Sequence, residues 1–169
     1  MSIKVYKNSI LTFSDKEYRC IIGKNGLTTN KLEGDKKTPI GKFKISHVLF
    51  RGDRLHIPQI NLKTKKILPH DGWCDDPINI KYNQAIKFPF SGNFERLYRD
   101  DCLYDIVCII EYNTNPIISG KGSAIFFHLY DDKTKHTNGC VAVKRTDMIE
   151  ILAKVHNQII IDIIDEDYL

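Results

Sequence analysis

The chain has 169 residues, of which 42% are hydrophobic and 27% are charged, and its formal net charge is +4. This balance excludes a disordered chain. No run approaches the ~18 consecutive apolar residues of a membrane-spanning helix, so we expect no membrane insertion. The slight basic excess is scattered and lacks a stacked-aromatic motif, so we expect no nucleic acid partner. No repeat or long linker divides the sequence, which predicts one domain over residues 1–169.

In chain order, turn signals rich in Gly, Asn, Asp and Pro separate short β-branched or aromatic runs. The runs that predict strands are residues 18–23, 41–50, 103–112, 123–130, 140–144 and 158–164. Residues 147–155 instead carry apolar side chains at helical spacing, with Thr146 as the expected N-cap. The pattern predicts a mainly β sandwich or barrel with one helix near its end.

Cysteine usage and the N-terminus bear on the compartment. The five cysteines are Cys20, Cys74, Cys102, Cys108 and Cys140. An odd number without paired spacing argues against a secreted disulfide framework. The first twenty residues lack the apolar run of a signal peptide. We therefore expect a cytoplasmic protein, or a periplasmic one if a leader has been removed.

Two segments raise ligand-binding hypotheses. GDKKTPIGKF, residues 34–43, has the wrong glycine spacing for a phosphate-binding loop, and Phe43 stands where Ser or Thr is required. PHDGWCDD, residues 69–76, gathers His70, Asp71, Cys74, Asp75 and Asp76, all potential zinc ligands. Because a second distant pair is missing, we favour a turn packed around Trp73. A non-enzymatic zinc or peptidoglycan-binding module remains the alternative.

His128 and Cys140 form a candidate catalytic pair. Cys140 follows Gly139, which allows positive φ and close approach of the backbone to a substrate. Backbone amides there could form an oxyanion hole. His128 ends a β-rich run, and an imidazole beside a thiol can take its proton and later return it to a leaving group. His136 is a rival base. Spacing alone also allows a buried cysteine beside a core histidine.

Two motifs carry a family resemblance. FFHLYDDKTKHTNGCVAV, residues 126–143, resembles the His…Ser/Thr-x-Gly-Cys signature of the YkuD family of L,D-transpeptidase catalytic domains. TPIGKF, residues 38–43, resembles the upstream Thr-Pro-x-Gly-x-Phe segment of that family. The segments DGWCDDP, YN and DCLYDIV, at residues 71–77, 82–83 and 101–107, resemble a branch of short YkuD-like proteins. The resemblance covers nearly the whole chain and implies a YkuD-like β-sandwich with a short helix after the catalytic cysteine strand.

The resemblance also implies site residues. Cys140 matches the family nucleophile and His128 its general base, and Gly139 and Thr137 match further positions of the motif. Two positions depart from the common pattern. Asn138 stands where many members have His, and Ala142 stands where many have Arg or Asn. We therefore expect substrate-binding groups from elsewhere. The candidates are Trp73, Arg96, Tyr104, Thr137, Asn138 and Arg145.

The reaction implied is acyl transfer from a peptidoglycan stem tetrapeptide, or a muropeptide, cut between the L-centre of a diamino acid and D-Ala. Neither a metal nor an organic cofactor is implied. With water as acceptor the enzyme is an L,D-carboxypeptidase of peptidoglycan recycling or turnover. With the amine of a second stem it is a crosslinking L,D-transpeptidase. We favour water, because crosslinking requires assembled wall outside the membrane and the sequence carries no export signal.

Overall fold

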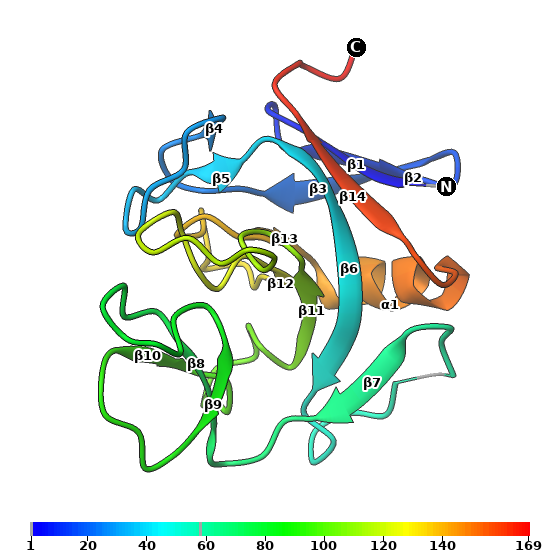
Figure 1. Ribbon diagram of the computed structural model, residues 1–169. Helices are drawn as coiled ribbons and strands as arrows, with labels where there is room; N and C mark the ends of the chain where they lie inside the picture. The colour runs from blue at the N-terminus through cyan, green and yellow to red at the C-terminus, as the bar shows by residue number, and fades with distance from the viewer. Residues whose placement is uncertain (1, 58) are drawn as a thin grey trace.

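The computed structural model describes residues 2–57 and 59–169 and consists mainly of β-strands, as the sequence predicted (Figure 1). Within these residues, nine strands form the main sheet in the order β11-β12-β13-β3-β2-β1-β14-β6-β7. Their bounds are β1 Ser2–Tyr6, β2 Ile10–Phe13, β3 Lys16–Ile21, β6 Gly41–Phe50, β7 Lys63–Lys66, β11 Ile106–Ile110, β12 Phe126–Leu129, β13 Val141–Val143 and β14 Ile160–Ile164. Of these, the sequence pattern did not indicate β1, β2 or β7.

The long strand β6 closes the main sheet on itself. Its first residues, 41–44, pair with β14, and residues 45–50 pair with β11, the strand at the other end of the sheet order. A register irregularity between Cys108 and Ile110 interrupts the β6–β11 ladder. Such a bulge bends a strand and increases its twist. The sheet therefore curls into a barrel-like layer around one apolar interior.

Alternating residues of the main-sheet strands fill this interior. Ile3 and Val5 of β1, Leu11 of β2, and Ile161 and Ile163 of β14 are each at most 1% exposed. Their polar neighbours on the same strands face outward, as the period of two requires. Burial on this scale supplies most of the favourable free energy that holds the strands in register.

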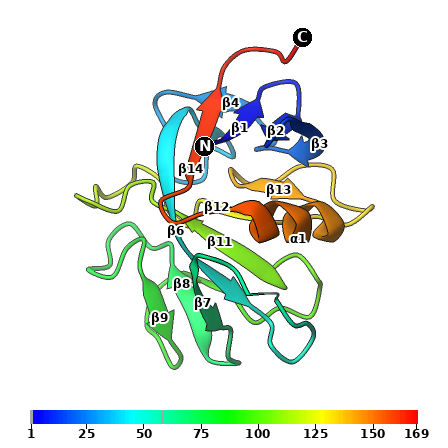
Figure 2. The ribbon, with the colours of Figure 1, turned by 90° about the vertical axis from the view of Figure 1, so that its right-hand side faces the viewer.

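One helix, α1, spans Arg145–Lys154 and buries Met148, Ile151 and Leu152 (Figure 2). The prediction that Thr146 caps it is wrong, because the N-cap is Lys144. Lys144 is extended directly after β13, and its carbonyl already accepts the first helical bond from the Met148 amide at 2.9 Å. The helix therefore begins two residues earlier than predicted. Within the described residues, no helix is long and apolar enough to span a membrane.

Two smaller sheets lie on one side of the main sheet (Figure 1). A three-stranded sheet has the order β10-β8-β9, with bounds β8 Asp71–Cys74, β9 Ala85–Lys87 and β10 Phe94–Arg96. A two-stranded parallel sheet pairs β4, Leu27–Thr28, with β5, Thr38–Pro39. The segment around Trp73 was expected to be a turn. It is a strand instead, because both of its edges are paired.

Candidate active site

A cavity of about 500 Å³ is lined by residues from both small sheets and from the main sheet. The loop between β4 and β5 contributes Lys31, Glu33, Gly34 and Lys36, and the three-stranded sheet contributes Glu95 of β10 and Asp75 just after β8. Cys140 and His128 both line this cavity, together with Tyr104, Thr137 and Asn138. The fold thus brings five of the candidate residues to one place.

The parallel pairing of β12 with β13 positions the catalytic candidates. His128 lies opposite Ala142 in this ladder, two residues beyond Cys140. The Cys140 Sγ accepts the Phe126 amide at 3.3 Å and lies 3.2 Å from the Ala124 carbonyl oxygen, to which its S–H donates. Cys140 is 7% exposed and His128 is 5% exposed. Both reactive groups therefore line the cavity and are largely shielded from bulk water.

Burial sets the protonation state of the thiol. Burial, helped by the nearby negative charge of Glu95, raises the pKa of Cys140 to about 12. The Phe126 amide and Lys31 lower that pKa, but by less than burial raises it. A thiolate is the nucleophilic form. Cys140 is therefore a neutral thiol at rest and needs a base to become reactive.

His128 is held as a neutral imidazole. Burial lowers its pKa to about 4, while the backbone carbonyls of Leu129 and Leu103 act in the opposite direction. Its Nδ1 lies 2.8 Å from the Leu129 oxygen, which can only accept, so Nδ1 carries the proton. The lone pair of the neutral ring is then on Nε2. Tyr104 packs edge-on against the ring at a centroid distance of 5.1 Å, which helps to fix its orientation.

The turn before Cys140 requires glycine at position 139. Gly139 has φ +132°, and a Cβ there would lie 2.9 Å from the Lys37 carbonyl oxygen. The Gly139 amide donates to Thr137 Oγ1 at 3.1 Å, and this hydroxyl donates to the Cys140 carbonyl at 2.7 Å. The Thr137 hydroxyl thus stabilises the turn by bonding to both Gly139 and Cys140. Because the Thr137 hydroxyl occupies the Gly139 amide, that amide is not free to donate to an oxyanion.

The two sequence motifs meet at the cysteine. Thr38, the first residue of TPIGKF, is fully buried, and its hydroxyl lies 3.4 Å from the Cys140 carbonyl oxygen. The same hydroxyl accepts the Gly23 amide at 2.8 Å. The upstream motif therefore supports the backbone that carries the thiol, which gives it a structural reason to accompany the cysteine motif.

Three candidate substrate-binding residues lie outside this cavity. Trp73 is buried, donates to Asn83 Oδ1 at 3.0 Å and packs edge-on against Phe126. Arg96 is exposed on β10 and lies over the Phe88 ring at 4.7 Å. Arg145 begins α1 and forms an ion pair with buried Asp105. Their contacts assign them to packing and to surface structure rather than to the space around Cys140.

The cavity is lined by charged residues that the sequence analysis did not name as substrate-binding candidates. They are Lys31, Glu33, Lys36, Asp75, Glu95 and Arg99. Asp75 had been considered only as a potential zinc ligand. These residues come from three separate segments, and no local pattern marks them as neighbours. His136, the rival base, is exposed and also lines the cavity.

Within residues 2–57 and 59–169, no group of three His, Cys, Asp or Glu side chains is arranged so that it could hold a metal ion. His70 is exposed, Cys74 is fully buried, and Asp71 is paired with Lys87 and accepts the Leu68 amide. Each of the five cysteines is a free thiol.

Comparison with known proteins identifies the family. Residues 3–161 match YkuD, the L,D-transpeptidase catalytic domain. This chain belongs to the YkuD family. The family match makes it an L,D-transpeptidase-type domain of peptidoglycan enzymes, and it confirms both the resemblance and the mainly β fold.

Two solved structures are similar to this YkuD domain. Bd1075 from Bdellovibrio bacteriovorus is 18% identical, with a TM-score of 0.51 over 98% of this chain and 48% of Bd1075. The helical cell shape determining protein Pgp2 from Campylobacter jejuni is 12% identical, with a TM-score of 0.47 over 99% of this chain and 48% of Pgp2. The likeness to Bd1075 shows a shared fold, and the chain spans about half the length of either protein. No curated protein sequence matches the chain.

Proposed function

We propose that this YkuD domain is a cysteine acyl-transfer enzyme that removes D-Ala from peptidoglycan stem tetrapeptides, and so acts as an L,D-carboxypeptidase. The observation that carries the proposal is the shared cavity of Cys140 and His128, with the Nδ1 proton of His128 held by the Leu129 carbonyl. That contact leaves Nε2 free to act as a base.

The proposed first half-reaction forms a thioester. His128 Nε2 takes the thiol proton, and the sulfur attacks the carbonyl carbon between the diamino acid and D-Ala. The Cys140 amide stabilises the oxyanion. The intermediate collapses, the C–N bond breaks, and the imidazolium gives its proton to the departing D-Ala amine. The carbonyls of Leu129 and Leu103, which raise the pKa of His128, favour the transient imidazolium.

In the second half-reaction, we propose water as the acceptor. His128 takes a proton from water, the hydroxide attacks the thioester, and the thiol leaves with that proton. A cavity of about 500 Å³ is within the range of sites that hold one small ligand. Because Cys140 lines it and is only 7% exposed, the end of one stem plus water fits this space more readily than two stems meeting at the sulfur.

The test is incubation with a disaccharide-tetrapeptide, followed by mass analysis of the products. We expect loss of one alanine, release of D-Ala, and no dimer. A dimer would instead assign transpeptidation with the amine of a second stem as acceptor. Cys140→Ala should abolish turnover, whereas Cys102→Ala, at a half-buried cysteine outside the cavity, should not. Full turnover by folded Cys140→Ala would contradict the proposal.

A further inference from the structure

Three carboxylates line the wall of the cavity that contains Cys140. Glu33 lies in the loop between β4 and β5, Asp75 directly follows β8, and Glu95 lies on β10. Side chains from three separate segments therefore present negative charge to the space where a substrate would lie. None of them belongs to the YkuD signature motifs around Cys140 and Thr38.

No ion pair neutralises these carboxylates in the described residues, although the nearby charge of Arg99 lowers the pKa of Glu95. Among the residues that the structure describes, none of the three forms an ion pair. The basic residues nearby are otherwise engaged or exposed. Lys31 is bonded to Asp35 and to the Leu32 carbonyl, and Arg99 is paired with Asp101. The third basic residue of the cavity lining, Lys36, is exposed.

Asp75 also has an orphaned oxygen. Its Oδ1 is buried yet accepts no hydrogen bond from any residue in the described part of the chain. Burial raises the pKa of Asp75, and the charge of Glu33 raises it further. The pKa of Glu95 is raised by burial and by the charges of Asp75 and Glu33. A half-buried carboxylate with an unsatisfied oxygen near two other carboxylates destabilises the fold and is a mark of a functional site.

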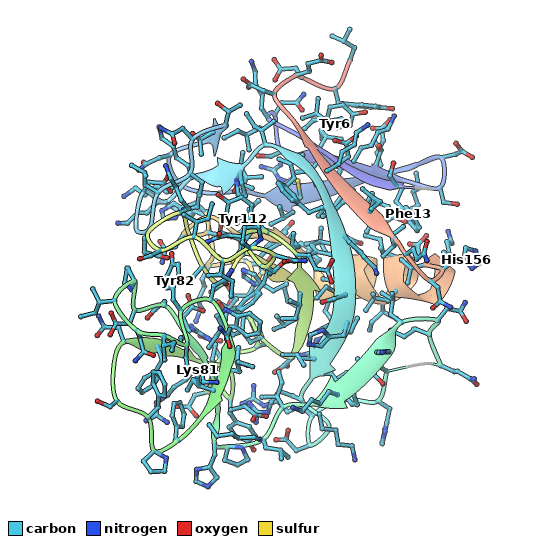
Figure 3. The ribbon with its side chains drawn as sticks, viewed as in Figure 1. Tyr6, Phe13, Lys81, Tyr82, Tyr112 and His156 are labelled. Carbon is cyan, nitrogen blue, oxygen red and sulfur yellow. The ribbon has the colours of Figure 1, made fainter. Side chains whose placement is uncertain are left out.

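The other two carboxylates are oriented by hydroxyl donors. The Tyr82 and Ser123 hydroxyls both donate to Glu33 Oε2, the latter at 2.7 Å. Tyr82, labelled in Figure 3, lies on the side of the molecule away from His156 at the end of α1. The Tyr104 hydroxyl donates to Glu95 Oε2 at 2.7 Å. These bonds hold one oxygen of each carboxylate in place through neutral donors and bring no positive charge to it.

We infer that Glu33, Asp75 and Glu95 form a subsite for the side-chain ammonium of the diamino acid whose carbonyl Cys140 attacks. This inference rests on the proposed function, because it uses the stem peptide as substrate. The diamino acid supplies the scissile carbonyl and carries a spare amine at the far end of its side chain. An ammonium offers three donors, which matches a wall of carboxylate acceptors that includes one unsatisfied oxygen. The enzyme therefore selects stems whose side-chain amine is free.

The test compares two tetrapeptides that differ in one group. One contains diaminopimelate with a free distal amine, and the other carries an acetyl group on that amine. We expect wild-type kcat/KM to be at least about tenfold higher for the free amine, the usual scale for a buried charge pair. Asp75→Asn and Glu95→Gln should remove most of this preference, chiefly through KM. Asp167→Asn, at an exposed residue near the C-terminus, should retain it.

Binding to Cys140→Ala, measured calorimetrically with the same two peptides, separates this inference from the proposed reaction. Tighter binding of the free amine, lost on adding Asp75→Asn, would support the subsite even if neither peptide is turned over by the wild type. Equal binding of both peptides, or of neither, would overturn it. A preference that survives Asp75→Asn and Glu95→Gln would do the same, while leaving D-Ala release by Cys140 intact.

Discussion

Cys140 should be a slow nucleophile outside catalysis, because the free enzyme holds it as a thiol. Burial raises its pKa from 9.0 to about 12, a rise of about three units. Each unit is a tenfold change in the thiolate fraction, so at pH 7 that fraction is about 1000-fold below that of an unperturbed cysteine. Alkylation by iodoacetamide follows the thiolate. The rate at Cys140 should therefore be about 1000-fold below that of N-acetylcysteine.

The pH profile separates ionisation from access. Limited access lowers the alkylation rate equally at every pH, whereas a raised pKa makes the rate climb about tenfold per pH unit up to pH 10. The assay is mass spectrometric quantification of the Cys140 adduct between pH 6 and pH 10, with Cys140→Ala to identify the peptide. A plateau below pH 8 would refute the reasoning, since it would mean that His128 and Cys140 already form an ion pair at rest.

Three further predictions follow from the same contacts. His128→Ala should lower kcat/KM for D-Ala release by orders of magnitude, whereas His136→Ala should lower it little; the reverse ranking would make His136 the base. In the wild type, kcat/KM should decline as the pH falls through about 4, because protonation of His128 removes the base. Gly139→Ala should cost about 1–3 kcal/mol in denaturant unfolding and more than Gly26→Ala, since both have positive φ but only at Gly139 would a Cβ strike a carbonyl oxygen. Asp75→Asn should raise the free energy of unfolding at pH 7, because the pKa of Asp75 is raised in the fold. The gain should shrink as the pH falls and vanish only below about pH 3, where the carboxyl is protonated in both folded and unfolded chains. A loss of stability at pH 7 would contradict the unpaired charge.

The sequence alone indicated the features that depend on neighbours along the chain. The spacing of Met148, Ile151 and Leu152 predicted the helix, and the β-branched and aromatic run at residues 41–50 predicted β6 over its full length. The Thr-x-Gly-Cys order could be recognised because it encodes one turn. Positive φ at Gly139 and the hydroxyl of Thr137 both act within three residues of Cys140.

The tertiary structure decided which short segments are strands and which candidate residues reach the cavity. Strands β1 and β2 are at most five residues long, and pairing rather than composition makes them strands. Trp73, Arg96 and Arg145 have residue types suited to binding, yet their packing partners hold them outside the cavity. Side-chain chemistry states what a residue can do, but the fold determines what it meets.

The protonation states of Cys140 and His128, and the grouping of the three carboxylates, are also features that only the tertiary structure decides. A thiol with a pKa of about 12 and an imidazole with a pKa of about 4 result from burial by segments distant in sequence. Glu33, Asp75 and Glu95 become neighbours only when the two small sheets fold against the main sheet. Desolvation and charge–charge interaction depend on distance in space. Separation along the chain predicts distance in space only over a few residues. Between residues farther apart in sequence, the fold alone determines that distance.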